Sequence, residues 1–329
     1  MKKSITMITI FLSCILNVYA LDNLHFNLLG NKYAAGIEAH LGVSALRMTE
    51  TVYQDSSDNG LSSDRLLSEI DWDMGAQMTA GTGLNVTPVN PFAKIGFSFE
   101  GNFWWYFPAN DRTMKDTDWD DNGKKYGYGE SIASALTGME AEGRLAAIFP
   151  IRNKCLIEAA AEVWYGRYAA VAHHGWTSWA DSGEKIPLYG AAIEYIQEWI
   201  MFAPGVGFGL KLNNARIGVR AAVSPFLWGY HIDNHYFRTL ENNDPEQKYI
   251  SYTDKTNGGI FYRIQGDCRW DITRYVQVGI AVNYRAVINS RGDTTMSTTG
   301  LAGYSFVEDG TAGAAMQTFG CDLTIRTTL

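Results

Sequence analysis

Regular alternation of apolar and polar residues is the feature of this sequence that most restricts its fold. A period of two puts successive side chains on opposite faces of a β-strand. Four separate stretches show it, and their apolar positions are Ile70, Trp72, Met74, Ala76 and Met78; Ile95, Phe97, Phe99, Phe103, Trp105 and Phe107; Ile217, Val219, Ala221 and Val223; and Val276, Val278, Ile280, Val282 and Tyr284. The pattern therefore predicts an all-β fold.

A soluble β-sandwich alternates in the same way, so length and aromatic content have to separate the two classes. Strands of about 10 residues cross a bilayer, and several of the alternating stretches reach that length. The chain has 18 Tyr, 15 Phe and 10 Trp, and the segments Phe103-Trp104-Trp105-Tyr106-Phe107 and Trp164-Tyr165 resemble the aromatic girdles of membrane barrels. We therefore predict a transmembrane β-barrel.

The N-terminal segment has the features of a secretory signal peptide. Two lysines precede an apolar run from Ile5 to Leu16, and Val18-Tyr19-Ala20 suits a signal peptidase. The alternative is a lipoprotein signal with an acylated Cys14. The sequence predicts a signal peptide at residues 1–20 and an outer-membrane barrel at residues 21–329.

Charge and cysteine content exclude some functions. Removal of residues 1–20 takes away two lysines and no acidic residue, so the formal net charge changes from −8 to −10. A nucleic-acid partner is disfavoured by that sign. The remaining cysteines, Cys155, Cys268 and Cys321, are too few and too far apart for a disulfide framework or a metal motif.

Connecting segments give the number of strands. Short turns are expected at Gly83–Pro91, Pro150–Lys154, Lys211–Asn214 and Asp271–Arg274, and long polar loops at Tyr53–Asp64, Asn110–Gly127, His174–Pro187, Asp233–Lys248 and Ser290–Ala312. Five long loops that alternate with four short turns predict a ten-stranded antiparallel up-and-down barrel. The long loops of such barrels are extracellular.

Two acidic clusters fall in these predicted loops, and so at one rim. The first is Asp116-Thr117-Asp118-Trp119, and the second is Asp233-Asn234-His235-Tyr236. His235 is a candidate general base, because the unperturbed pKa of histidine lies near neutrality. Residues two apart in an extended segment project to the same side, so Asp233 can orient the imidazole and stabilise the imidazolium.

Asp116 and Asp118 share a face by the same spacing, and one of two close carboxylates can keep a proton near neutral pH. Acidic loop segments are also common as solvated turns or loose cation sites, and this interpretation stays open for the first cluster. No Gly-x-Ser-x-Gly, His-Glu-x-x-His or paired-cysteine motif competes with the two clusters.

With these two motifs, the chain resembles the omptins, a family of outer-membrane aspartate-histidine endopeptidases. The segments Met114 to Trp119 and Asp233 to Tyr236 are similar to the Asp-x-Asp-Trp and Asp-x-His-Tyr segments of that family, and Arg65 to Trp72 is similar to its second strand. The resemblance implies a water molecule held between Asp116 and His235, with Asp118 supporting Asp116. It implies peptide or protein substrates with basic residues, and no metal or other cofactor.

Substrate preference can be partly predicted. Alternation from Glu38 through Ser44 puts Glu50 on the inner side at the upper end of its strand. The segment Arg47 to Tyr53 is similar to the omptin segment whose glutamate receives a basic side chain, which implies cleavage after Arg or Lys. Omptins commonly carry a second acid where this chain has His231. That histidine would oppose an incoming arginine if protonated, would titrate with the site, or would be a packed side chain.

The residues expected to bind lipid are a second difference between this chain and the omptins. Omptins grip lipopolysaccharide with basic residues on the outer face, and Arg167 is similar to one of them. Glu198 stands where another arginine is usual, and an acid repels a lipid phosphate. Activation by a lipopolysaccharide-like lipid is therefore an open expectation. The alternative function is a non-catalytic barrel, either a surface adhesin or a small porin, although ten strands leave little room for a channel.

Overall fold

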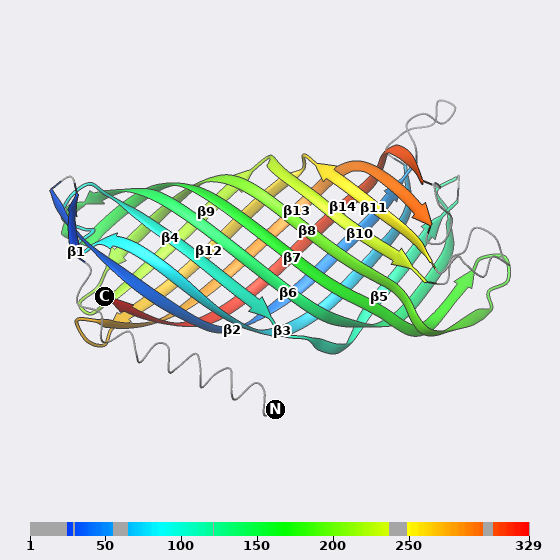
Figure 1. Ribbon diagram of the computed structural model, residues 1–329, viewed down its shortest axis with the longest axis horizontal. Coiled ribbons are helices and arrows are strands. Elements are labelled where there is room, and N and C mark those ends of the chain that lie inside the picture. Colours follow the sequence, from blue (N-terminus) through cyan, green and yellow to red (C-terminus); the bar gives the residue numbers. More distant parts are fainter. Residues whose placement is uncertain are drawn as a thin grey trace.

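The protein is a long barrel of tilted antiparallel strands (Figure 1). The computed structural model describes residues 25–28, 30–54, 65–120, 122–236, 249–298 and 305–328, so the predicted signal peptide lies outside the described residues. The elements are β1 (His25–Leu28), β2 (Asn31–Tyr53), β3 (Leu66–Pro88), β4 (Gly96–Tyr106), β5 (Ala109–Trp119), β6 (Lys125–Ile151), a 3-10 turn (Arg152–Lys154), β7 (Cys155–Trp179), β8 (Lys185–Lys211), β9 (Ala215–Ser224), β10 (Phe226–His235), β11 (Ile250–Asn257), β12 (Ile260–Asp271), β13 (Val276–Thr298) and β14 (Ser305–Thr328).

The ring has ten positions, as predicted. β4 and β5 share one position between β3 and β6, β9 and β10 share another beside β8, and β11 and β12 share a third beside β13. β14 pairs with β2 and closes the ring, while β1 adds a short hairpin to β2. Two of the three breaks have a local cause: Pro225 lacks a backbone N–H, and Gly258 and Gly259 have φ values of 71° and 79°.

The predicted alternation describes the two faces of the wall. Phe97, Phe99, Phe103 and Trp105 point outward and are 39–48% exposed, whereas Glu100 on the same strand is buried inside. Trp104, Tyr106 and Trp164 also point inward and are buried, so only part of the predicted aromatic girdle faces lipid. The inner aromatic residues fill the lumen, because the barrel is too narrow to leave it open.

The outward apolar band marks the membrane-spanning part. On β2 it includes Leu41 and Val43 and is followed by Arg47, which is 55% exposed and binds Asp71 of β3 at 2.6 Å. On β10 the band ends at Tyr230. The strands continue well beyond both points. β6 and β8 have 27 residues each, more than twice the 9–11 needed to cross a bilayer.

The acidic clusters lie on these strand extensions, so the predicted loops were partly wrong. Asp116 and Asp118 belong to β5, and Asp233 and His235 end β10. Three other predicted segments also differ: β7 and β8 extend into His174–Pro187, β13 and β14 into Ser290–Ala312, and β3 through Pro88 into Gly83–Pro91. Outside the bilayer the outer face of a strand meets water, while the inner face carries buried polar groups such as Asp233 and His235. The hydrophobic contrast between the faces therefore fades while the backbone ladder continues. Residues 55–64 and 237–248 of the other two predicted loops are outside the described ranges.

Ion pairs lie inside the barrel at membrane depth, some between neighbouring strands and some across the lumen. Arg144 binds Glu158 at 2.6 Å and Glu162 at 3.1 Å. Arg220 of β9 binds Glu100 of β4 through two nitrogens, at 2.7 and 2.9 Å. Further pairs are Arg263 with Glu142, Arg285 with Glu140, and Arg326 with Glu38. These side chains are mostly buried, so the charged layer fills the barrel interior.

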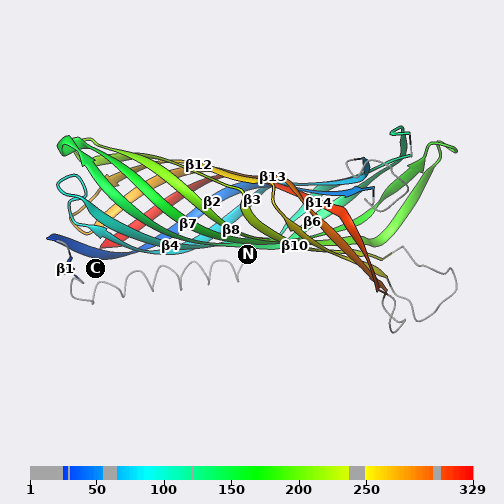
Figure 2. The same cartoon turned by 90° about the horizontal axis from the view of Figure 1, so that it is seen from above.

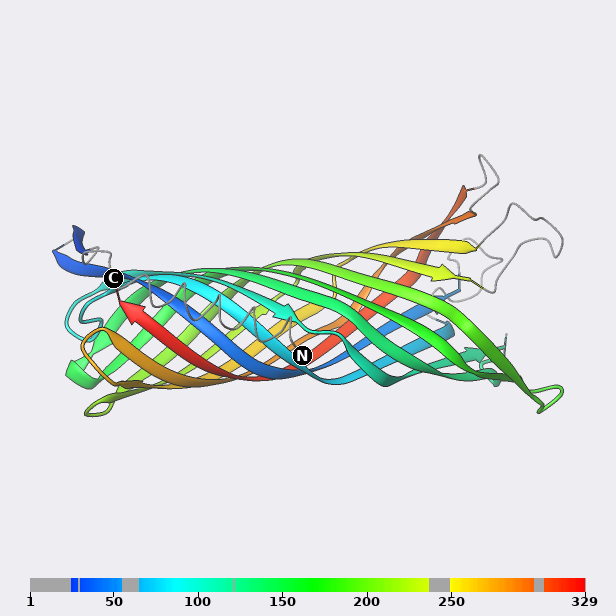
Figure 3. The same ribbon diagram turned by 60° about the horizontal axis from the view of Figure 1, so that its bottom comes forward.

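Both ends of the barrel are identifiable. β1 and the C-terminal end of β14 lie together at one end, and the strand extensions lie at the other (Figure 1). At the extended end, β13 and β14 diverge from the hairpin of β7 and β8 (Figures 2 and 3). Within the described ranges no helix is long and apolar enough to cross a membrane. Cys155, Cys268 and Cys321 are free thiols.

Candidate active site

Asp233 and His235 form a contact pair at the extended end of β10. The carboxylate Oδ2 of Asp233 hydrogen-bonds His235 Nε2, and both residues are buried, at 2% and 5% exposed. The edge of the Tyr252 ring on β11 meets the His235 ring at 5.3 Å and 81°. These two contacts fix the imidazole. Because Nε2 binds Asp233, Nδ1 is the nitrogen left to accept a proton.

Glu50 lies on the same inner face of the barrel. It is 4% exposed and is the neighbour of Ile70 on β3, which in turn is the neighbour of Asp116 on β5. Two interstrand steps separate the backbones of Glu50 and Asp116, about 10 Å. Burial, followed by the charges of Asp233, Asp254 and Asp116, raises the pKa of Glu50 well above its usual value. Glu50 thus lies close to both acidic clusters.

Asp116 and Asp118 are half-buried on β5. The hydroxyl of Ser68 on β3 donates to Asp116 Oδ1 at 3.5 Å. Asp118 faces Gly127 of β6, where an added Cβ would lie 2.7 Å from Asp118 Oδ2. The glycine therefore makes room for the carboxylate, and the two aspartates share one face of the strand, as their spacing predicts.

His231 is enclosed by protein. It is 0% exposed, its Nε2 lies 3.1 Å from the hydroxyl of Thr256, and its ring centroid lies 4.6 Å from that of Trp199. Burial lowers the pKa of His231 to about 3. The ring is therefore neutral across the physiological pH range, and it adds no positive charge that would oppose a basic substrate.

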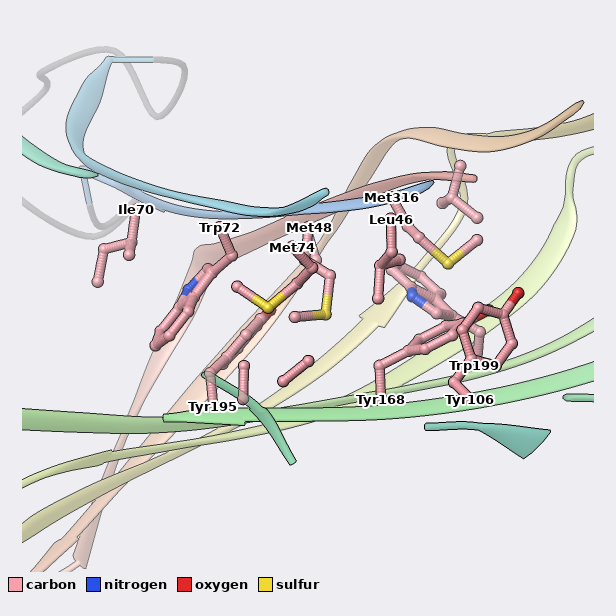
Figure 4. Close-up of a cluster of buried hydrophobic side chains, with 14 of the residues drawn as sticks. Leu46, Met48, Ile70, Trp72, Met74, Tyr106, Tyr168, Tyr195, Trp199 and Met316 are labelled. Carbon is pink, nitrogen blue, oxygen red and sulfur yellow. The ribbon is translucent and has the colours of Figure 1, made fainter. Parts of the chain in front are cut away.

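A cluster of buried hydrophobic side chains precedes the acidic position Glu50 along β2 and includes Leu46 and Met48. Figure 4 shows part of this cluster. Trp72 stacks on Tyr195, with ring centroids 5.8 Å apart and planes at 13°. Met48, Met74 and Trp199 are fully buried beside them. This cluster separates the site from the ion pairs of the lumen.

Arg167 and Glu198 form an ion pair on the outer wall. Arg167 of β7 and Glu198 of β8 are cross-strand neighbours, and their side chains meet at 2.7 Å while each stays about 30% exposed. Glu198 therefore neutralises the guanidinium group of Arg167, the residue that the resemblance to omptins suggested for lipid binding. A lipid phosphate has to compete with Glu198 for Arg167.

Several residues of the site escaped the sequence analysis. Asp254 and Tyr252 of β11 face the same interior as Asp233, and Ser68 and Gly127 flank the two aspartates of β5. The inward parity of Tyr252, Asp254 and Thr256 was the available signal for β11. Within the part of the chain that the structure describes, no group of His, Cys, Asp and Glu side chains has an arrangement that could hold a metal ion.

A family model and one solved structure agree with this architecture. The model of the Omptin family matches residues 31–326. The outer membrane protease OmpT from Escherichia coli superposes with a TM-score of 0.78 at 17% identity, over 94% of this chain and 99% of that chain. The outer membrane protein OprG from Pseudomonas aeruginosa gives a TM-score of 0.29 at 7% identity, over 90% of this chain and 96% of that chain. No curated protein matches the sequence.

Proposed function

The chain belongs to the Omptin family, and we propose that it is an outer-membrane endopeptidase that hydrolyses peptide bonds next to basic residues. Family and fold assign the barrel to the outer membrane. One observation carries the proposal. Three strands far apart in the sequence bring Glu50, Asp116 and the Asp233–His235 pair to one inner face beyond the membrane band.

The chemistry follows from the orientation of His235. With Nε2 held by Asp233, Nδ1 takes a proton from a water molecule as the water oxygen attacks the scissile carbonyl carbon. Asp233 stabilises the imidazolium that forms. The proton then passes to the leaving amine as the carbon–nitrogen bond breaks. Asp116 orients the water and Asp118 supports Asp116, as the resemblance implies.

Glu50 is the proposed binding group for the basic side chain of the substrate. It is buried, and the hydrogen bonds within the described residues leave its Oε2 without a partner. A guanidinium or ammonium group would supply both a donor and a compensating charge. Burial and the neighbouring acids raise the pKa of Glu50, and a cationic ligand would favour its ionised form.

A porin is the less suitable alternative. The pairs of Arg144, Arg220 and Arg263 with glutamates fill the lumen at membrane depth. An open channel would need those side chains to leave. An adhesin would use the same strand extensions without needing His235, so replacing that residue separates the two classes.

The test is cleavage of fluorogenic peptides with and without paired basic residues by the refolded protein. His235→Ala is the inactivating variant, and His174→Ala is the matched control because His174 is an exposed histidine on the extension of β7. Cleavage by wild type and control, but not by His235→Ala, supports the proposal. Equal cleavage by all three, or none by a folded wild-type barrel, contradicts it.

A further inference from the structure

Three carboxyl groups near the candidate site lack a permanent cation. Glu50, Asp233 and Asp254 are each no more than 4% exposed, and in the described ranges none of them pairs with a lysine or arginine. Two of their oxygens, Glu50 Oε2 and Asp233 Oδ1, are buried and have no hydrogen-bond partner among the described residues. His235 binds one of them, Asp233.

Asp254 enters this cluster through strand pairing. It is the direct neighbour of His231 across β10 and β11, so the two side chains project from the same inner face with Cβ atoms about 5 Å apart. Its Oδ1 accepts a hydrogen bond from the Thr294 hydroxyl at 2.8 Å, which fixes the carboxyl group against β13. Asp254 of β11 thus lies beside His231 of β10, the position where omptins commonly carry an acidic residue.

The electrostatics of the cluster favour a cationic guest. Burial and the charge of Asp233 raise the pKa of Asp254 to about 7, and Asp254 in turn contributes to the raised pKa of Glu50. A positive group placed between these carboxyls would favour their ionised forms and reverse both effects. His231 is neutral and packed on Trp199, so it does not supply that charge.

We propose that Asp254 is a specificity-determining residue that, together with Glu50, receives the guanidinium or ammonium group of the substrate side chain. The inference rests on the proposed peptidase function. It explains how the site has two acidic residues for a basic side chain although His231 occupies the position where omptins commonly carry the second one. In this chain the second acid is Asp254, the cross-strand neighbour of His231. Asp254 does not touch the reacting atoms in this scheme.

The test compares two fluorogenic peptides that differ at one position, arginine or its uncharged analogue citrulline before the scissile bond. Asp254→Asn keeps the shape and removes the charge, and it should lower kcat/KM for the arginine peptide by about 30-fold or more. Cleavage of the citrulline peptide should change little. Asp293→Asn is the matched control, because Asp293 is exposed on the outer face and faces Lys255.

An unchanged ratio of arginine to citrulline cleavage in folded Asp254→Asn overturns the inference. If Asp254→Asn does not fold, the exchange variant His231→Asp/Asp254→His decides: retained arginine preference supports the inference, and its loss overturns it. Failure of the peptidase proposal looks different, because the wild-type protein itself would then cleave neither peptide.

Discussion

Replacing Asp254 by asparagine should change how the stability of the barrel depends on pH. The carboxyl group of Asp254 is 4% exposed and faces Glu50, Asp233 and the neutral ring of His231. Its pKa rises from 3.8 in the unfolded chain to about 7 in the barrel, through burial and then through the charge of Asp233. The folded state therefore holds this proton more tightly than the unfolded state does.

The sign and size follow from linkage. Between pH 3.8 and about 7 the folded protein binds more protons at this site than the unfolded protein, so stability falls as the pH rises. A separation of about 3 pH units corresponds to about 4 kcal/mol, at about 1.4 kcal/mol per unit. This contribution favours folding below pH 3.8 and is lost above pH 7. Asparagine cannot ionise. The unfolding free energy of the variant minus that of wild type should therefore be larger at pH 8 than at pH 4, by up to about 4 kcal/mol.

The assay is urea unfolding of the barrel in lipid vesicles, followed by tryptophan fluorescence at pH 4, 6 and 8. The relevant quantity is the difference in unfolding free energy between variant and wild type at each pH, which cancels the titration of groups that do not interact with Asp254. Asp293→Asn, the same exchange at an exposed position, is the matched control. A difference for Asp254→Asn that does not change with pH would refute the assignment of the raised pKa to this buried carboxyl group.

Three further outcomes are expected. Asp233→Asn should lower kcat by about 10²- to 10⁴-fold with little change in KM, because the imidazolium of the reaction loses its counter-charge, and an effect confined to KM in steady-state kinetics would contradict this. Glu198→Gln should release Arg167 for lipid phosphate and strengthen binding to vesicles that contain lipopolysaccharide several-fold, and unchanged binding in a flotation assay would argue against it. Arg144→Met removes one of the two arginines beside each of the buried Glu158 and Glu162, which keep only the longer contacts with Arg220 and Arg263, and should cost about 3 kcal/mol of unfolding free energy, so a loss below about 1 kcal/mol in urea unfolding would count against the pairing.

The sequence predicted the faces of the strands well because side-chain direction depends on local backbone geometry. Glu38, His40, Ser44 and Glu50 were expected inside from parity alone, and all four are buried. The ten-stranded ring and the family were also confirmed. The chemical roles of Asp116, Asp118, Asp233, His235 and Glu50 stay predictions for the assays above.

Strand ends and long-range pairs were not predictable in the same way. Asp116 and Asp233 were expected in loops because hydrophobic contrast, the main signal for a strand, fades where the outer face meets water and the inner face carries polar groups. Asp254 was missed because its proximity to His231 depends on the register of β10 and β11, which the sequence does not fix across the intervening segment. Likewise, the ion pair of Arg285 with Glu140, 145 positions apart, depends on the stagger of the closed barrel.

The ion pairs of the lumen have a consequence for how the protein enters a membrane. Arg220 with Glu100 and Arg285 with Glu140 join strands that are not neighbours in the ring. A partly inserted sheet would therefore expose these charges to hydrocarbon or leave them without counter-ions, and either state is costly. These two pairs form only when the sheet curls and brings opposite sides of the wall together. We therefore expect insertion and curling of the sheet to be coupled, because a flat sheet in the bilayer would keep these charges apart.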